Sequence, residues 1–108
     1  MLKRIADNLE AIRAVCRRFG VLRLETYEDS AYDEADPEWS PVRFLVDLGA
    51  GDDANPWHSI DLALALEGEI GRFVVLTERR LVGDQRLLAS TVNERVTIYD
   101  SRKQQAAA

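Results

Sequence analysis

Three residues of this sequence are of the types that carry out hydrolysis in a catalytic triad: Asp29, Ser30 and His58, the last being the chain's single histidine. A serine nucleophile needs a histidine base within hydrogen-bond reach, and a carboxylate that holds the histidine in place. No nucleophile-elbow pattern flanks Ser30, and no sequence feature brings His58 close to it. A half-exposed position for His58 in the first turn of a helix is the simpler prediction. Hydrolysis by Ser30 and His58 is a minor alternative.

The single cysteine, Cys16, is expected to be a buried, unreactive thiol, because it borders an apolar stripe and no histidine lies near it in the sequence. One cysteine excludes an internal disulfide and fits a reducing compartment, so we expect a cytoplasmic protein. One histidine and one cysteine without ligand spacing give no zinc-site pattern. The sequence therefore predicts no bound metal.

An acidic segment runs from Glu25 to Glu38 and contains seven Asp or Glu residues and no Lys or Arg. Tyr27 and Tyr32 lie within it, and Trp39 follows it. Such a run of like charge is either a solvated loop or a surface that attracts a basic partner. The formal net charge of −5 argues against general nucleic-acid binding.

The length of 108 residues predicts one domain, over residues 1–100, followed by a disordered tail, 101–108. No apolar run approaches the length that spans a membrane. Gly20 and Gly71 are placed to end helices, and Asn55 with Pro56 to begin one. The predicted elements are a helix over 2–18, strands over 21–27 and 42–48, a helix over 57–70, a strand over 73–76, a helix from 84 to 92 and a strand over 96–99.

This order, together with short motifs, resembles the minimal nucleotidyltransferases. These are the smallest members of the DNA polymerase β-like superfamily and are often antitoxin partners of HEPN toxins. The resemblance extends from Leu2 to about Tyr99 and implies an α/β (α+β) fold in which helices pack on one small mixed sheet, in the order α-β-β-α-β-α-β. The motifs that carry it are Leu24-Glu25, Asp36-Pro37-Glu38, Ser40, the run from Phe44 to Leu48, and Gly71-Arg72.

The residues that would carry out this family's chemistry are replaced. Laid on the chain without gaps, the family's phosphate-binding Gly-Ser falls on Glu28 and Asp29, and its metal-binding Asp-x-Asp on Pro41 and Arg43. Anions in place of Gly-Ser repel phosphate, and a ring and a cation cannot hold Mg²⁺. The family's third carboxylate would fall in residues 73–76, which contain no acid. The family's two arginines fall on Tyr32 and Trp39, and one of its glycines falls on Asp33. The sequence therefore predicts no nucleotidyl transfer, no bound nucleotide and no cofactor.

These replacements gather in the family's cleft and consist of aromatic rings, acids and a guanidinium, as in protein-binding surfaces. We interpret the former active-site cleft as a protein-binding surface, in a designed binder or inhibitor of another protein with a basic surface. The alternative is a natural, degenerate antitoxin that docks a HEPN-type toxin. Tyr32 and Trp39 are the predicted anchors, and Arg43 pairs either with a partner carboxylate or within the chain. The predicted partner-binding residues are Tyr27, Glu28, Asp29, Tyr32, Asp33, Trp39, Pro41 and Arg43.

Overall fold

The computed structural model describes residues 3–27, 41–48, 56–79 and 95–103. The first helical segment is not the single helix that its apolar spacing predicts, but two: α1 (Lys3–Asp7) and α2 (Leu9–Phe19). The break falls at Asn8, whose side-chain Nδ2 donates a hydrogen bond of 2.7 Å to the backbone oxygen of Arg4. Asparagine competes in this way with the helical hydrogen bonds of the backbone, which explains the interruption.

Helix α2 ends where the sequence predicts. Gly20 has a φ of 69°, in the left-handed region that residues with a Cβ rarely adopt. Its N–H donates to the oxygen of Arg17, and the N–H of Val21 donates to that of Cys16 at 3.0 Å. This pairing satisfies carbonyls at the helix end and turns the chain toward the first strand.

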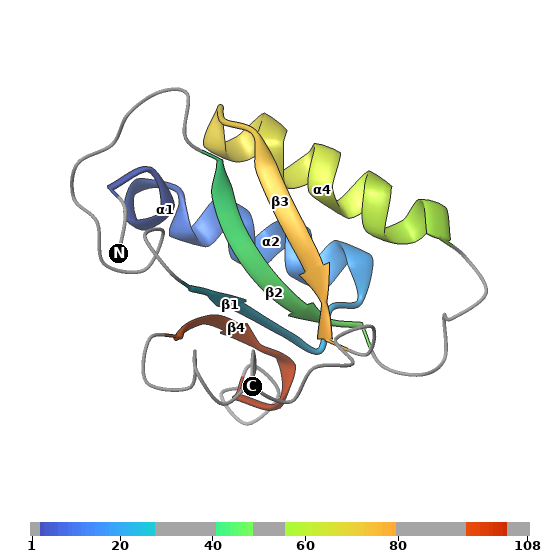
Figure 1. The fold of residues 1–108 in the computed structure, drawn as a ribbon. Coiled ribbons are helices and arrows are strands. Elements are labelled where there is room, and N and C mark those ends of the chain that lie inside the picture. Colours follow the sequence, from blue (N-terminus) through green and yellow to red (C-terminus); the bar gives the residue numbers. More distant parts are fainter. Residues whose placement is uncertain (1–2, 28–40, 49–55, 80–94, 104–108) are drawn as a thin grey trace.

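The sheet has four strands in the order β3-β2-β1-β4. β1 is antiparallel to both of its neighbours, whereas β2 and β3 are parallel. A parallel pair needs a long crossover, and helix α4 supplies it between β2 and β3 (Figure 1). The mixed sheet and the helices that pack on it confirm the predicted fold class. The bounds are β1 Arg23–Thr26, β2 Val42–Asp47, α4 Pro56–Ile70, β3 Val74–Glu78 and β4 Val96–Asp100.

Two predictions lie partly or wholly outside the described residues. The helix predicted over 84–92 falls in one of the gaps. Of the predicted tail, residues 101–103 form a helical turn, and the N–H of Ser101 donates to the oxygen of Leu22 at 2.9 Å. The remainder of the tail, 104–108, is outside the described ranges.

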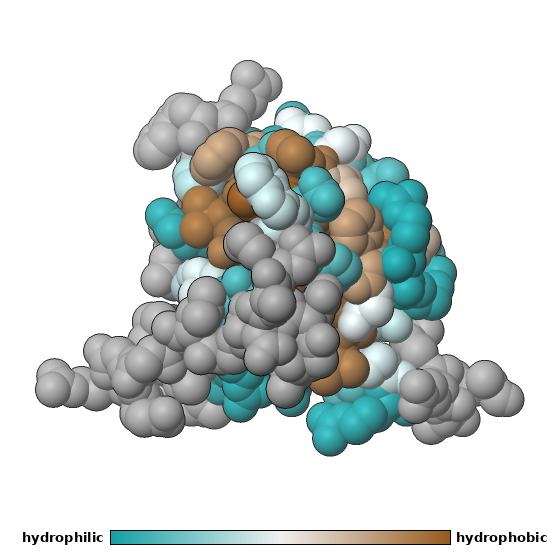
Figure 2. All heavy atoms as spheres, turned by 90° about the vertical axis from the view of Figure 1, so that its right-hand side faces the viewer, coloured by the Kyte–Doolittle hydropathy of each residue, from teal (hydrophilic) through white to brown (hydrophobic). Residues whose placement is uncertain are grey.

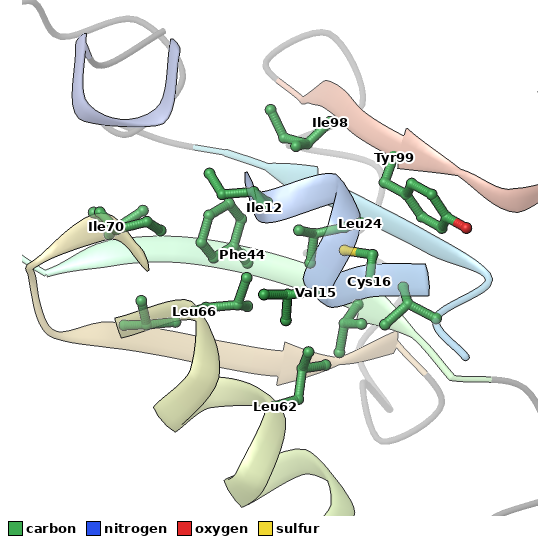
Figure 3. Close-up of a cluster of buried hydrophobic side chains, with 14 of the residues drawn as sticks. Ile12, Val15, Cys16, Leu24, Phe44, Leu62, Leu66, Ile70, Ile98 and Tyr99 are labelled. Atoms are coloured by element: carbon green, nitrogen blue, oxygen red, sulfur yellow. The ribbon is translucent and has the colours of Figure 1, made fainter. Parts of the chain in front are cut away.

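The hydrophobic core lies between the helices and one face of the sheet. Val42, Phe44 and Val46 alternate along β2 and are fully buried, as the strand pattern predicts. Figure 1 shows α2 and α4 on the same side of the sheet, and Figure 3 shows side chains from both helices meeting Phe44. The labelled helix residues in that cluster are Ile12, Val15, Cys16, Leu62, Leu66 and Ile70.

Cys16 is part of this core, with no exposed surface, which confirms that its thiol is buried. Burial raises the pKa of the Cys16 thiol from its ordinary 9.0 to about 12, against a smaller lowering by the charge of Arg17. Because the folded-state pKa is the higher one, the thiol's contribution to stability is complete below about pH 9 and is lost as the pH rises toward 12.

We expect native Cys16 to react with an aromatic disulfide reagent at pH 8 at least about a hundredfold more slowly than the unfolded chain, since the thiolate is the reacting species. The measurement is the release of the reagent's coloured thiol with and without urea. Reaction at similar rates in the two conditions would show that the thiol is accessible in the folded protein.

In the described parts of the chain, no helix combines the length and the apolar character needed to cross a membrane.

Candidate functional site

The structure describes three of the predicted partner-binding residues, Tyr27, Pro41 and Arg43. The others lie within residues 28–40, outside the described ranges, as do Asp29 and Ser30 of the considered triad. The proposed cleft surface and the triad therefore stay predictions from the sequence.

Tyr27 is buried, with 7% of its surface exposed. Its hydroxyl lies 3.3 Å from the hydroxyl of Thr77 in β3. Because β2 lies between β1 and β3, this contact crosses β2 on the face of the sheet that looks away from the core. The contact gives Tyr27 a role in holding the sheet, and a role in partner binding stays a prediction.

Arg43 and Pro41 lie at the start of β2. Val42 and Phe44 on either side of Arg43 point into the core, so Arg43 belongs to the opposite face, where it is half-buried. Its partner in the parallel register is Val75 of β3. The backbone oxygen of Arg43 accepts a hydrogen bond of 3.0 Å from the hydroxyl of Thr26, and Pro41 is half-buried.

A cluster of charged side chains on this opposite face was not predicted from the sequence. Glu25 is 5% exposed, and one of its carboxylate oxygens lies 3.4 Å from Nε of Arg23 and 3.6 Å from Nη1 of Arg95. Arg23 also donates from Nη2 to the hydroxyl of Thr97 at 3.2 Å. We call these four residues the Glu25 cluster. It has one carboxylate against two guanidiniums, so a buried acid is balanced by two cations, as burial of charge requires.

His58 lies in the first turn of α4 and is half-buried, as predicted. Its Nε2 is 2.9 Å from the backbone oxygen of Phe19, and the two rings are 5.6 Å apart. A carbonyl oxygen can only accept, so Nε2 carries the proton in this contact. The histidine therefore ties α4 to the end of α2, which is a structural role.

Helix α4 is apolar on two sides. Leu62, Leu66 and Ile70 are buried in the core at a spacing of four residues. Trp57, Ile60 and Leu64 are 67%, 47% and 59% exposed, at a spacing of three and four, so they follow one outer face. We call these three residues the α4 stripe. A surface helix normally has a polar outer face, so the stripe is the feature of α4 that the sheet does not explain.

The region around the start of α4 can be seen in Figure 2, which views the molecule from the right-hand side of Figure 1. Hydrophobic side chains gather at the surface of the upper half of this view, among hydrophilic ones. The apolar spacing at 57, 60 and 64, beside that at 62, 66 and 70, is the sequence signal that could have revealed two apolar faces. Exposed apolar residues in a group are typical of binding surfaces.

Among the described residues, no group of three or more His, Cys, Asp or Glu side chains is placed to hold a metal ion.

The comparisons with known proteins support the fold. No family model matches this sequence, and no curated protein does. The structure of a protein described as a minimal nucleotidyltransferase is similar, with a TM-score of 0.72 and 28% identity, over 85% of this chain and 90% of that one. A toxin-antitoxin structure with AMP-PNP has a TM-score of 0.68 and 15% identity, over 93% of this chain and 79% of the other.

A third similar structure is a complex of a tri-AMPylated Shewanella oneidensis HEPN toxin with an MNT antitoxin. Its TM-score is 0.61 and its identity 14%, over 94% of this chain and 77% of the other. The chain therefore has the minimal nucleotidyltransferase fold, and the neighbour with 28% identity supports the superfamily that the sequence motifs indicate.

Proposed function

We propose that this chain is a non-catalytic protein of nucleotidyltransferase fold that binds a protein partner of the HEPN toxin type. The observation that carries the proposal is the α4 stripe, where three large apolar side chains are exposed on one face of a helix. The neighbours add support, because structures with this fold include complexes of an antitoxin with a HEPN toxin. The engineered origin considered for the sequence stays a prediction.

Residues at the start of β2 support the proposal that the chain carries out no nucleotidyl transfer. The family's metal-binding carboxylates would fall on Pro41 and Arg43, and Arg43 lies on the face away from the core, beside Val75. The guanidinium of Arg43 repels Mg²⁺, and the ring of Pro41 offers Mg²⁺ no ligand. Glu25 on the neighbouring strand is engaged by Arg23 and Arg95. This face is thus better suited to a protein partner than to a metal-nucleotide complex.

We expect Mg²⁺ to leave the protein's response to ATP unchanged. A ligand at a hundred times its Kd stabilises a protein by about 2.7 kcal/mol, which raises the melting temperature measurably. The measurement is the melting temperature in millimolar ATP with and without Mg²⁺, with Mg²⁺ alone as control. A Mg²⁺-dependent rise of the melting temperature in ATP would contradict the proposal and favour nucleotidyl transfer.

The α4 stripe is tested with Trp57→Ala. A large, exposed aromatic at the centre of an interface costs about 2 kcal/mol or more when truncated, equal to at least a thirtyfold loss of affinity. Glu69→Ala is the matched control, because Glu69 is exposed near the other end of the same helix and lies outside the stripe. The partners are HEPN-family proteins of the same genome, and binding is measured by calorimetry after size-exclusion chromatography.

The proposal fails if no HEPN-family protein binds. The sequence predicts the former cleft as a second surface, through Trp39 and Arg43. If Trp39→Ala or Arg43→Ala abolishes binding while Trp57→Ala leaves it intact, the partner docks on the cleft and the assignment to the α4 stripe is wrong. Melting temperatures of all variants separate lost contacts from lost folding.

A further inference from the structure

A hollow of about 350 Å³ lies at one end of the sheet. β1 is antiparallel to β2 and β4, and β2 is parallel to β3. One end of the sheet therefore holds the start of β1 and the ends of the other three strands (Figure 1). Pro41 and Arg43, two described residues of the predicted cleft surface, lie at the opposite end of the sheet, where β2 begins. The two sites are therefore separate.

Three guanidiniums border this hollow, which we call the Arg pocket. Arg23 comes from β1, Arg79 follows β3 and Arg102 follows β4, and the remaining described lining residues are Leu22, Asp47 and Ser101. The lining holds three guanidiniums and one carboxylate, in a chain whose net charge is −5, and the carboxylates of Asp100 and Glu25 lie beside it against Arg102 and Arg23. Guanidiniums gathered at a concave site attract anions.

The arginines of the pocket keep donors for a ligand. Arg102 donates a long hydrogen bond of 3.5 Å from Nε to the carboxylate of Asp100, and Arg23 donates from Nη2 to the hydroxyl of Thr97. The buried Nε of Arg23 has no hydrogen bond, although it lies near the Glu25 carboxylate. A guanidinium has five N–H donors, so these contacts leave several unused.

The guanidiniums at this end of the sheet affect the pKa of Asp100, a residue that is 7% exposed. Its burial alone would raise its pKa, but hydrogen bonds from the backbone and side chain of Arg102, with the charges of Arg102 and Arg23, outweigh it and lower the pKa of Asp100. Two of the three guanidiniums thus act together on a carboxylate already present beside the pocket.

We propose that the Arg pocket binds the phosphate group of a small hydroxylated compound, such as a phosphorylated sugar or polyol. Guanidinium forks match phosphate oxygens and hold them by charge-assisted hydrogen bonds. The carboxylate of Asp47 repels a bare anion, the hydroxyl of Ser101 can exchange hydrogen bonds with hydroxyl groups of the ligand, and Leu22 supplies an apolar wall. The volume lies at the small end of the range for ligand sites.

The test uses ribose 5-phosphate, with ribose and inorganic phosphate as separate arms, in amide NMR titrations of the intact chain without metal. We expect saturable shifts centred on Leu22, Asp47 and Ser101, with ribose 5-phosphate binding more tightly than either arm. Arg79→Gln and Arg102→Gln should each weaken it by about tenfold or more, as loss of a charge-assisted hydrogen bond does. Both side chains are exposed, so the variants should fold normally.

Lys3→Gln is the control, because it removes one positive charge from an exposed position of α1, away from the pocket. It should leave affinity unchanged within about twofold, since salt screens distant charges. The proposal is overturned if no shifts saturate, if they centre on residues 41–43, or if Lys3→Gln weakens binding as much as Arg79→Gln. Equal binding of inorganic phosphate would overturn the ligand class, because the hydroxyl groups would then contribute nothing.

Discussion

Replacing Glu25 by alanine is expected to lower the free energy of unfolding by about 3 kcal/mol, as removal of one partner from a buried ion pair does. The carboxylate is almost completely buried between Arg23 and Arg95, and the side chain of Arg95 is itself only 11% exposed. Without Glu25, the Arg95 guanidinium stays in a poorly solvated place, with no carboxylate of the described residues to balance its charge. The measurement is urea unfolding followed by circular dichroism.

Glu10→Ala is a matched control, because it also removes a glutamate that pairs with an arginine. Glu10 lies 2.9 Å from Nη1 of Arg13, a shorter distance than either contact of Glu25, but its side chain is 82% exposed. An exposed pair on a helix contributes at most about 0.5 kcal/mol. Burial, rather than distance, therefore decides which variant is the more damaging. Equal losses from the two variants would show that the Glu25 cluster is solvated and contributes little.

The Glu25 cluster also shows where sequence reasoning stops. Arg23 and Glu25 flank the core residue Leu24, so the sequence places both on one face of β1. Arg95 is far away in the sequence and reaches them only because β4 pairs with β1. The Arg pocket is hidden for the same reason, since its residues come from the ends of four strands. Local periodicity does not report which strands are neighbours.

Local features were predictable where one residue decides the geometry. Gly20 ends α2 because of its positive φ, and the alternation along β2 places Val42, Phe44 and Val46 in the core. The break at Asn8 was not predictable in this way. The apolar spacing continues across Asn8, but its side chain competes for a backbone oxygen and interrupts the helix. Periodicity predicts which face is buried, but not whether the backbone is continuous.

Phe44→Ala is expected to cost about 3–5 kcal/mol of unfolding free energy, a large part of the stability of a domain of this size. Phe44 has no exposed surface and lies at the centre of the side chains that α2 and α4 bring to the sheet (Figure 3). Alanine there loses the apolar transfer energy of the ring and leaves a cavity that a packed core closes only in part. Chemical denaturation with a constant slope would measure the loss as a shift of the midpoint.

Phe73→Ala is the same chemical change at a residue that is 67% exposed and directly precedes β3. Because its ring contributes little to the core, we expect a change within about 0.5 kcal/mol, as for surface substitutions in general. The backbone oxygen of Phe73, which accepts from the N–H of Val42 at 2.9 Å, is retained in the variant. If Phe73→Ala were as destabilising as Phe44→Ala, the ring would have to be covered in solution. That outcome would show that the Phe73 ring is packed against another surface.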